Sequence, residues 1–304
     1  MKTSRQHFFP FIATLCVAAA LLVPSVVHSQ SVIEEAIQAY GQKNVEGYIQ
    51  PVADLFAANV NSGFYHSAAI PKTGFHMSLD IIGMAAPISD DQKTYTATTP
   101  PGFNPVSFQT ATIFGGKGTT VAHGTSAGLT YRGSDGIINS TIFPAAVPQL
   151  TIGSLYGTEA VIRFIAVPKM DQIPSLSLWG VGARHSISQY IPGAPIDIAA
   201  GFFYNKFKWG DIFDFNGLSF GAEASKSFSI LTLHAGINFE SSTLKISYTS
   251  TDPVAPGSVE LNLAGKRKVS FTAGLGLTLG FFQLFGNANF GSVNNFTAGI
   301  GFGG

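Results

Sequence analysis

Apolar side chains alternate with small polar ones along most of the chain after residue 74. In the segment 268–279, every second residue from Val269 to Leu279 is apolar, and the residues between them are glycine, serine or threonine. The segment 229–240 repeats this pattern with Leu231, Leu233, Ala235, Ile237 and Phe239. A period of two places alternate side chains on opposite faces of a β-strand. The pattern therefore predicts an all-β fold.

The polar positions of these strands separate two all-β architectures. The exposed face of a soluble β-sandwich should be rich in lysine, glutamate and aspartate. Here the polar positions are mostly glycine, serine, threonine and asparagine, which suits the lumen of a barrel. Segments of about 8–13 residues also match the length of a tilted strand that crosses a membrane. We therefore expect a transmembrane antiparallel β-barrel over residues 74–304.

Turn residues divide this region into about fourteen strands, an even number as in bacterial single-chain barrels. Twelve strands is the alternative, because Gly115-Gly116 is a poor turn signal between two of the segments. The expected strands are 74–87, 107–115, 119–132, 147–155, 158–167, 173–188, 196–208, 215–226, 229–240, 243–249, 258–264, 268–279, 281–291 and 295–302.

This register assigns the connections to two ends of the barrel. The stretches 88–106 and 133–146 become long outer loops, whereas Gly157 and Pro192-Gly193 lie in short turns at the periplasmic end. The connection 250–257 falls at the periplasmic end but is longer than such turns usually are. The even strand number returns both ends of the barrel to the periplasmic side, where the N-terminal helices are expected.

Residues 31–62 are the only part of the sequence with a helical pattern. Ser31 and Glu34 fit a capping box for a first helix that ends at Gly41, and Asn44 can cap a second helix. Pro51 either kinks the second helix or marks its first turn. Residues 30–73 are expected to form a helical plug or a lid, and the sequence leaves both open. The second helix would gather on one face Val45, Tyr48, Ile49, Val52, Leu55, Phe56 and Val60.

The first 29 residues read as a secretory signal peptide. Lys2 and Arg5 precede an almost wholly apolar stretch, and cleavage is expected after Ser29. The single cysteine, Cys16, is removed with this leader, so no disulfide is expected in the mature chain. The predicted location is the bacterial outer membrane.

Composition excludes two other classes of protein. Charged residues make up 11% of the 304 residues, and 17 basic side chains balance 17 acidic ones. Without a basic excess the chain cannot neutralise phosphates, which excludes nucleic acid as a partner. Beyond the leader it has no apolar run of about 18 residues, which excludes a helical membrane protein.

Three short motifs resemble an uncharacterised family of exported outer-membrane β-barrels from Bacteroidetes-like bacteria. They are 59–68, which leads into 74–79, then 173–182, and then 223–228. A helical N-terminal segment before about fourteen strands is also distantly similar to the outer-membrane long-chain fatty-acid transporters. That resemblance implies a hatch formed by the N-terminal segment and passage of hydrophobic molecules, but it assigns no functional residue.

Candidate catalytic and metal motifs are weak. Residues 124–128 match the G-x-S-x-G pattern of a nucleophile elbow around Ser126, but a strand and not a helix is expected to follow. The histidines are scattered without the spacing of metal ligands. We expect no enzyme activity and no cofactor.

Charged residues on strands are the candidate functional residues, because lipid contact would cost roughly 2–4 kcal/mol for a basic side chain near the midplane. They should point into the lumen, either as ion pairs that brace the barrel or as part of a substrate path. Lys245 and Glu260 fall on the same polar face in this register. The lumen candidates are Arg163, Arg184, Glu223, His234 and Glu240.

The sequence thus favours an outer-membrane channel or transporter for the passive passage of small hydrophobic molecules. A lipid-modifying barrel enzyme and a structural or surface-interaction barrel are the alternatives. The expected partners are outer-membrane lipid, a small hydrophobic ligand, and the outer-membrane assembly machinery, which reads last strands of the kind that ends near Phe302. The oligomeric state stays open.

Overall fold

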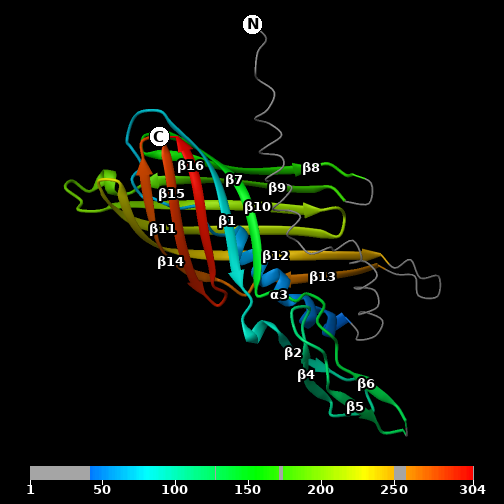
Figure 1. Cartoon of the computed structure of the whole chain (residues 1–304). Helices are drawn as coiled ribbons and strands as arrows, with labels where there is room; N and C mark the ends of the chain where they lie inside the picture. The colour runs from blue at the N-terminus through cyan, green and yellow to red at the C-terminus, as the bar shows by residue number, and fades with distance from the viewer. Residues whose placement is uncertain (1–41, 127, 171–173, 250–257, 304) are drawn as a thin grey trace.

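The computed structural model describes residues 42–126, 128–170, 174–249 and 258–303. Most of these residues form one antiparallel sheet that closes on itself (Figure 1). Ten of its eleven strands form the ring, in the order β11-β10-β9-β8-β7-β1-β16-β15-β14-β12, and pairing between β12 and β11 closes it. Their bounds are β1 His76–Pro87, β7 Ile142–Leu155, β8 Thr158–Val167, β9 Leu176–Ser186, β10 Asp197–Trp209, β11 Phe213–Phe228, β12 Leu231–Thr249, β14 Val269–Leu279, β15 Phe282–Gly291 and β16 Asn295–Gly303.

The expected strand number was wrong, both as fourteen and as twelve. The segments 107–115 and 119–132 do not enter the barrel, because they contribute instead to two small sheets outside it. The expected strands 229–240 and 243–249 are one continuous strand, β12, because Ser241 and Ser242 remain extended and keep the alternation in phase. The eleventh strand, β13 (Ser258–Ala264), pairs only with the last part of β12.

Continuity of β12 also explains why the connection 250–257 is longer than was expected of a periplasmic turn. The residues of that connection lie outside the described part of the chain, but β12 carries the chain across the barrel to the end where β1 finishes. We call this the loop end of the barrel. The opposite end, where β1 begins and where β7–β8, β11–β12 and β14–β15 are joined, is the turn end. The long connection therefore belongs to the loop end and not to the periplasmic turns.

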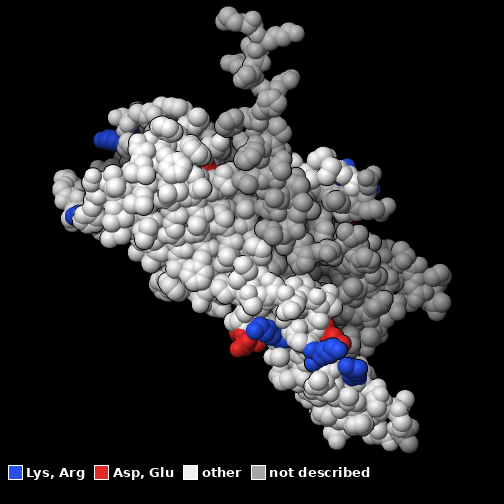
Figure 2. Space-filling view, viewed as in Figure 1, with Lys and Arg blue, Asp and Glu red and all other residues white. Residues whose placement is uncertain are grey.

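Residues 88–141 form one extension that projects from the loop end (Figure 1). It begins with a helical turn, η2 (Asp90–Gln92). Lys93, which follows this turn, forms an ion pair with Asp90, and its hydrogen bond lowers the pKa of that carboxyl. Figure 2 shows charged side chains gathered near the extension, whereas the barrel wall in view is almost uncharged. The strands of the extension are β2 Thr94–Thr98, β3 Phe103–Asn104, β4 Ser107–Ala111, β5 Val121–Gly124 and β6 Thr130–Arg132.

The barrel wall has an apolar outer face and a polar inner face. Phe202, Phe220 and Phe239 are neighbours on β10, β11 and β12, and each exposes between 42% and 53% of its surface. Inward positions near the turn end are polar and buried, including Ser225 and Thr232. This arrangement is the reverse of a soluble protein and is the one that lipid requires of a spanning barrel.

The arrangement returns to that of a soluble protein toward the loop end. On β12 the inward residues become Leu244 and Ile246, and the outward residues become Thr243 and Lys245. On the neighbouring β11, Phe215 points inward and is fully buried. The reversal marks a boundary near residue 240 of β12, beyond which the wall surrounds an apolar core.

Helix α3 (Gln42–Val60) supplies the other half of that core. Val45, Ile49 and Ala53 pack against the inward residues of the loop end. Pro51 lies within the helix, which continues through it. The helix begins at the loop end, where Asn44 binds the backbone of Thr98, so its expected position at the turn end was wrong. Within the described residues, no helix is long and apolar enough to cross a membrane.

The signal peptide, its cleavage after Ser29 and the first expected helix lie outside the described residues. The boundaries 30–73 and 74–304 therefore stay predictions, although β1 begins at His76 and α3 occupies the later part of the N-terminal segment.

The reversal on β12 predicts that the same substitution, to arginine, changes the free energy of unfolding differently at two positions on one face of the strand. Ala235→Arg places a cation on the apolar outer face and should lower the free energy of unfolding by roughly 2–4 kcal/mol. Thr243→Arg, on the same face beyond the boundary, should change it by less than about 0.5 kcal/mol. Urea unfolding from lipid vesicles measures both, and equal losses would contradict the boundary.

Candidate functional site

Residues 61–72 form most of the connection between α3 and β1 and cross the lumen as irregular backbone. The wall binds this segment from several sides. Asn287 on β15 donates to the carbonyl of Tyr65, the amide of Ala68 donates to Ser225 on β11, and Arg184 on β9 donates to the carbonyl of Ser67. Irregular backbone at membrane depth is tolerated where protein satisfies its polar groups. We call residues 61–72 the lumen segment.

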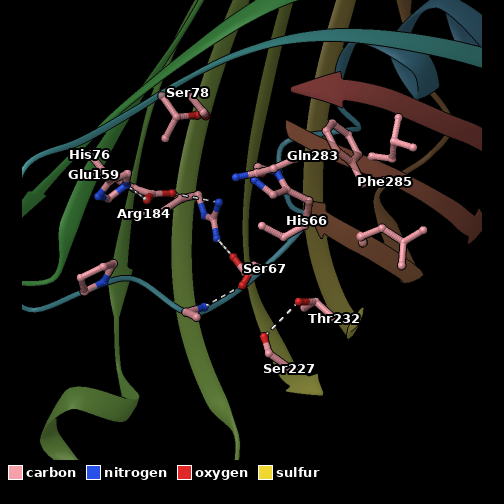
Figure 3. A pocket seen from close by; sticks show the side chains of 17 residues that line it. His66, Ser67, His76, Ser78, Glu159, Arg184, Ser227, Thr232, Gln283 and Phe285 are labelled. Carbon is pink, nitrogen blue, oxygen red and sulfur yellow. Dashed lines mark hydrogen bonds and ion pairs between the residues drawn. The ribbon is translucent and has the colours of Figure 1, made fainter. Parts of the chain in front are cut away.

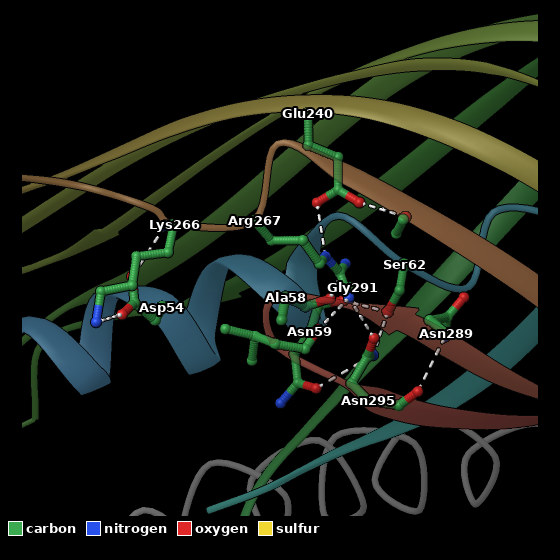
Figure 4. A network of polar contacts seen from close by, with 12 residues as sticks. Asp54, Ala58, Asn59, Ser62, Glu240, Lys266, Arg267, Asn289, Gly291 and Asn295 are labelled. Atoms are coloured by element: carbon green, nitrogen blue, oxygen red, sulfur yellow. Dashed lines mark hydrogen bonds and ion pairs between the residues drawn. The ribbon is translucent and has the colours of Figure 1, made fainter. Parts of the chain in front are cut away.

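The last turn of α3 meets two buried arginines. Arg267 donates to the carbonyl of Ala58 at 2.7 Å, and Arg163 donates to the carbonyl of Val60 at 2.9 Å (Figure 4 shows the first). The final carbonyls of a helix have no partner within the helix, and the helix dipole favours positive charge at this end. The two guanidinium groups therefore terminate α3 inside the barrel.

Arg163 also holds the first residues of the lumen segment. Its guanidinium donates to the carbonyl of Ser62 at 2.8 Å and to Gln149 at 2.9 Å, and it lies 3.8 Å from the centre of the Phe64 ring. The side chain exposes only 1% of its surface. A planar guanidinium can make all these contacts at once, which the ammonium of lysine cannot.

Arg184 lies in a chain of five charged or titratable groups around the turn end of the lumen. Nitrogen–oxygen distances along it are 3.0 Å for His76–Glu159, 2.9 Å for Glu159–Arg184, 3.5 Å for Arg184–Glu223 and 2.7 Å for Glu223–His234. Arg184 thus lies between two carboxylates, and each carboxylate also contacts a histidine.

Arg267 forms the third buried cluster. Its Nε donates to Glu240 at 3.1 Å, and Ser270 donates to the other oxygen of that carboxylate at 2.6 Å (Figure 4). Its Nη1 also donates to Asn295 at 2.7 Å. Glu240 therefore orients the guanidinium that caps α3.

The structure places the five candidates from the sequence inside the barrel and divides them among these clusters. Arg163 and Glu223 are not partners, because Arg163 binds backbone and Glu223 lies beside Arg184 and His234. Lys245 and Glu260 pair with each other at 2.5 Å on the outer surface, so their expected inward position was wrong. The reason is the reversal along β12, which puts Leu244 and Ile246 inside.

Sequence reasoning missed Arg267 and Glu159. Arg267 lies between Lys266 and Lys268 in the connection after β13, a run that normally indicates a solvated turn. Glu159 follows the turn at Gly157 and could have been found, because it lies four residues before Arg163 on β8 and therefore on the same face of the strand.

A cavity of about 260 Å³ opens beside the lumen segment at the turn end (Figure 3). In Figure 3, Arg184, Glu159 and His76 lie on one side, and His66, Gln283 and Phe285 lie on the other. The His66 ring stacks on Phe285 with 4.9 Å between ring centres. The remaining lining is provided by Ser67, Ala69, Pro71, Ser78, Thr151, Ser227, Thr232, Gly276, Leu277, Thr278 and Leu284.

At mid-depth the lumen is nearly filled. The space between the first residues of the lumen segment and Asn238, Asn287 and Asn289 measures about 10 Å³, no more than one water molecule needs. Among the described residues, this part of the lumen therefore leaves no room for a solute between the lumen segment and these asparagines.

Ser126 lies in the extension, after β5, and the next element is the short strand β6. A nucleophile elbow requires a strand followed by a helix. Among the described residues no group of three metal-ligating side chains comes together.

A family model for a family of unknown function, DUF6588, matches residues 1–304. The chain belongs to this family. Its description names no function and no bacterial group, so the two resemblances drawn from the sequence stay predictions. No curated protein matches the chain.

Among solved structures, the chain is distantly similar to outer-membrane proteins. The toluene transporter TbuX of Ralstonia pickettii is 10% identical with a TM-score of 0.26, over 86% of this chain and 99% of that one. A mutant porin of Rh. blastica is 10% identical with a TM-score of 0.17, over 76% and 100%. A BenF-like porin from Pseudomonas fluorescens Pf-5 is 9% identical with a TM-score of 0.17, over 75% and 97%. Similarities this distant do not establish a shared activity.

The contacts of Arg163 predict a large loss of stability in Arg163→Met. Two buried carbonyls and Gln149 would lose their donor, which should lower the free energy of unfolding by roughly 2–4 kcal/mol. Arg163→Lys should recover only part of this loss. The matched control is Arg132→Met in the extension, where a single bond of 3.2 Å to the carbonyl of Gly118 is lost. Urea unfolding in vesicles compares the three, and equal effects of the two methionine variants would refute the special role of Arg163.

Proposed function

We propose that this protein is an outer-membrane channel that its own lumen segment holds closed. The observation that carries the proposal is a barrel with an apolar outer face whose polar lumen is crossed by residues 61–72. Arg163 and Arg184 donate hydrogen bonds to the backbone carbonyls of Ser62 and Ser67 in that segment. When the segment leaves these contacts, the polar wall lines a path from the cavity at the turn end as far as the apolar core around α3, and a movement of α3 completes the opening.

The chemistry of the lumen bears on the cargo. The sequence favoured small hydrophobic molecules, but the cavity is lined by histidine, serine, threonine, glutamate and arginine side chains. An apolar molecule there would leave buried donors and acceptors without partners. The lining therefore favours small polar solutes. The proposal assigns no catalytic residue and no cofactor.

The leader and the last strand support the proposed location. A signal peptide over residues 1–29 would export the chain, and β16 carries the outward Phe302 next to its last residue, as expected of a strand that the assembly machinery reads. In this location the apolar outer face contacts membrane lipid.

A reversible crosslink between the lumen segment and the wall tests the channel. The amide of Ala68 lies 2.9 Å from Oγ of Ser225, and the mature chain as predicted has no cysteine, so Ala68→Cys with Ser225→Cys can form a single disulfide there. Liposome swelling with a small sugar should show permeation with the reduced protein. Oxidation should lower it to the level of protein-free liposomes, and reduction should restore it.

The control pair is Thr96→Cys with Gln109→Cys, which joins β2 to β4 in the extension, where the two side chains lie 2.7 Å apart. Its oxidation should leave permeation unchanged. Permeation that survives the Ala68–Ser225 crosslink, or that is absent from the reduced protein, would contradict a channel closed by residues 61–72.

A further inference from the structure

We propose that the cavity at the turn end is a binding site for a small, neutral, hydroxyl-rich solute of about the size of a hexose. The proposal rests on the proposed channel only for the route by which such a solute arrives. Its volume of about 260 Å³ corresponds to the share of roughly nine water molecules at about 30 Å³ each.

The charge balance of the lining favours a neutral solute. Arg184 already faces Glu159 at 2.9 Å and Glu223 at 3.5 Å, and Glu159 also faces His76 at 3.0 Å. An anion would compete with two carboxylates for Arg184, and a cation would compete with Arg184 and His76 for Glu159. A neutral ligand avoids both costs.

Buried polar atoms of the lining favour hydroxyl groups. Four of them have no hydrogen-bond partner within the described residues: His66 Nδ1, His76 Nδ1, Thr151 Oγ1 and Arg184 Nε. Arg184 exposes 2% of its surface and Thr151 exposes 4%, so bulk water reaches neither freely. The Nε of arginine can only donate, whereas a threonine hydroxyl donates and accepts. A hydroxyl also does both, so a polyol can satisfy this mixed set.

The cavity also provides a small apolar surface. Phe285 contributes its ring to the lining, across the cavity from Arg184 in Figure 3. The C–H face of a sugar or cyclitol ring can pack there while its hydroxyls reach the polar side. A wholly apolar solute would gain this contact but leave the four polar atoms unpaired, at about 1–3 kcal/mol for each group.

Gly276 offers a way to fill the cavity without disturbing the wall. A side chain built at this position would meet its nearest atom, the His66 carbonyl oxygen, at 3.6 Å, which is an ordinary contact. Gly276→Leu should therefore place its side chain in the cavity. Gly83→Leu is the matched control, because Gly83 lies on the outward face of β1 with its nearest contact at 3.7 Å.

The experiment measures binding by the full chain in nanodiscs, with saturation-transfer NMR titrations of glucose, gluconate, glucosamine and toluene. Glucose should bind more tightly than the other three. Gly276→Leu should weaken glucose binding roughly tenfold, equivalent to about 1.4 kcal/mol. Gly83→Leu should leave it unchanged. Thr151→Val, which preserves shape, should weaken binding several-fold and tests the site if Gly276→Leu does not fold.

Tighter binding of gluconate, glucosamine or toluene would overturn the neutral polyol. Unchanged glucose affinity in folded Gly276→Leu, or in Thr151→Val if only that variant folds, would overturn the site. These results are independent of the channel, because binding needs no passage across the membrane. Binding without permeation would remove the channel and keep the site, and permeation without binding would do the reverse.

Discussion

Backbone carbonyls that enter the barrel without a partner in regular secondary structure need donors, and three buried arginines bind four of them. Arg267 and Arg163 donate to carbonyls in the last turn of α3. Arg163 also donates to the carbonyl of Ser62, and Arg184 donates to the carbonyl of Ser67. Each arginine is in turn oriented by a neighbour on the wall, such as Glu240 for Arg267. Charge is rare in this chain, and the few charged groups of the lumen are placed where an irregular segment needs them.

The two zones of the inner wall follow from the two forms of chain that they surround. A helix satisfies its own backbone and presents side chains, so the wall around α3 is apolar, with Leu244 and Phe215 among its residues. The lumen segment presents backbone carbonyls together with Phe64 and Tyr65, so the wall around it is mostly polar but places Val161 and Phe203 against the two rings. The outer face changes in the opposite sense along β12, from Phe239 to Thr243, because lipid gives way to water. One strand thus carries both transitions near residue 240.

Much of the barrel could be predicted from the period of two, but its closure could not. Alternation identified β14 and β16 closely, because lipid on one side and polar groups on the other keep the pattern regular. The same pattern misled at Ser241-Ser242, where a change of environment inside one strand resembled a turn. It also misled at 119–132, because short strands outside a barrel alternate as well. Arg163 and Arg184 could be identified from the sequence, because a basic side chain on a strand is too costly to face lipid. The partners of Arg267 could not, because they come from distant parts of the chain.

The two zones also differ in whether water can replace the contacts that are lost when the chain inside them moves. Each apolar side chain of α3 that leaves the wall would lose about 1.5–3 kcal/mol of burial, and no solvent contact replaces it. A carbonyl released by Arg163 or Arg184 into an aqueous lumen gains a bond to water, and the net value of such a bond is about 1.5–3 kcal/mol, similar to that of one apolar side chain. The number of buried groups separates the two parts of the chain, because α3 buries eight apolar side chains and the lumen segment buries four. Residues 61–72 should therefore move more readily than the helix. Both ends of this segment are held, by α3 and by β1, yet twelve extended residues can reach about 40 Å, more than the apolar band of about 25 Å requires. An opening of this barrel then begins with a sideways shift of a tethered segment toward the wall, and passage through the loop end requires α3 to move after it.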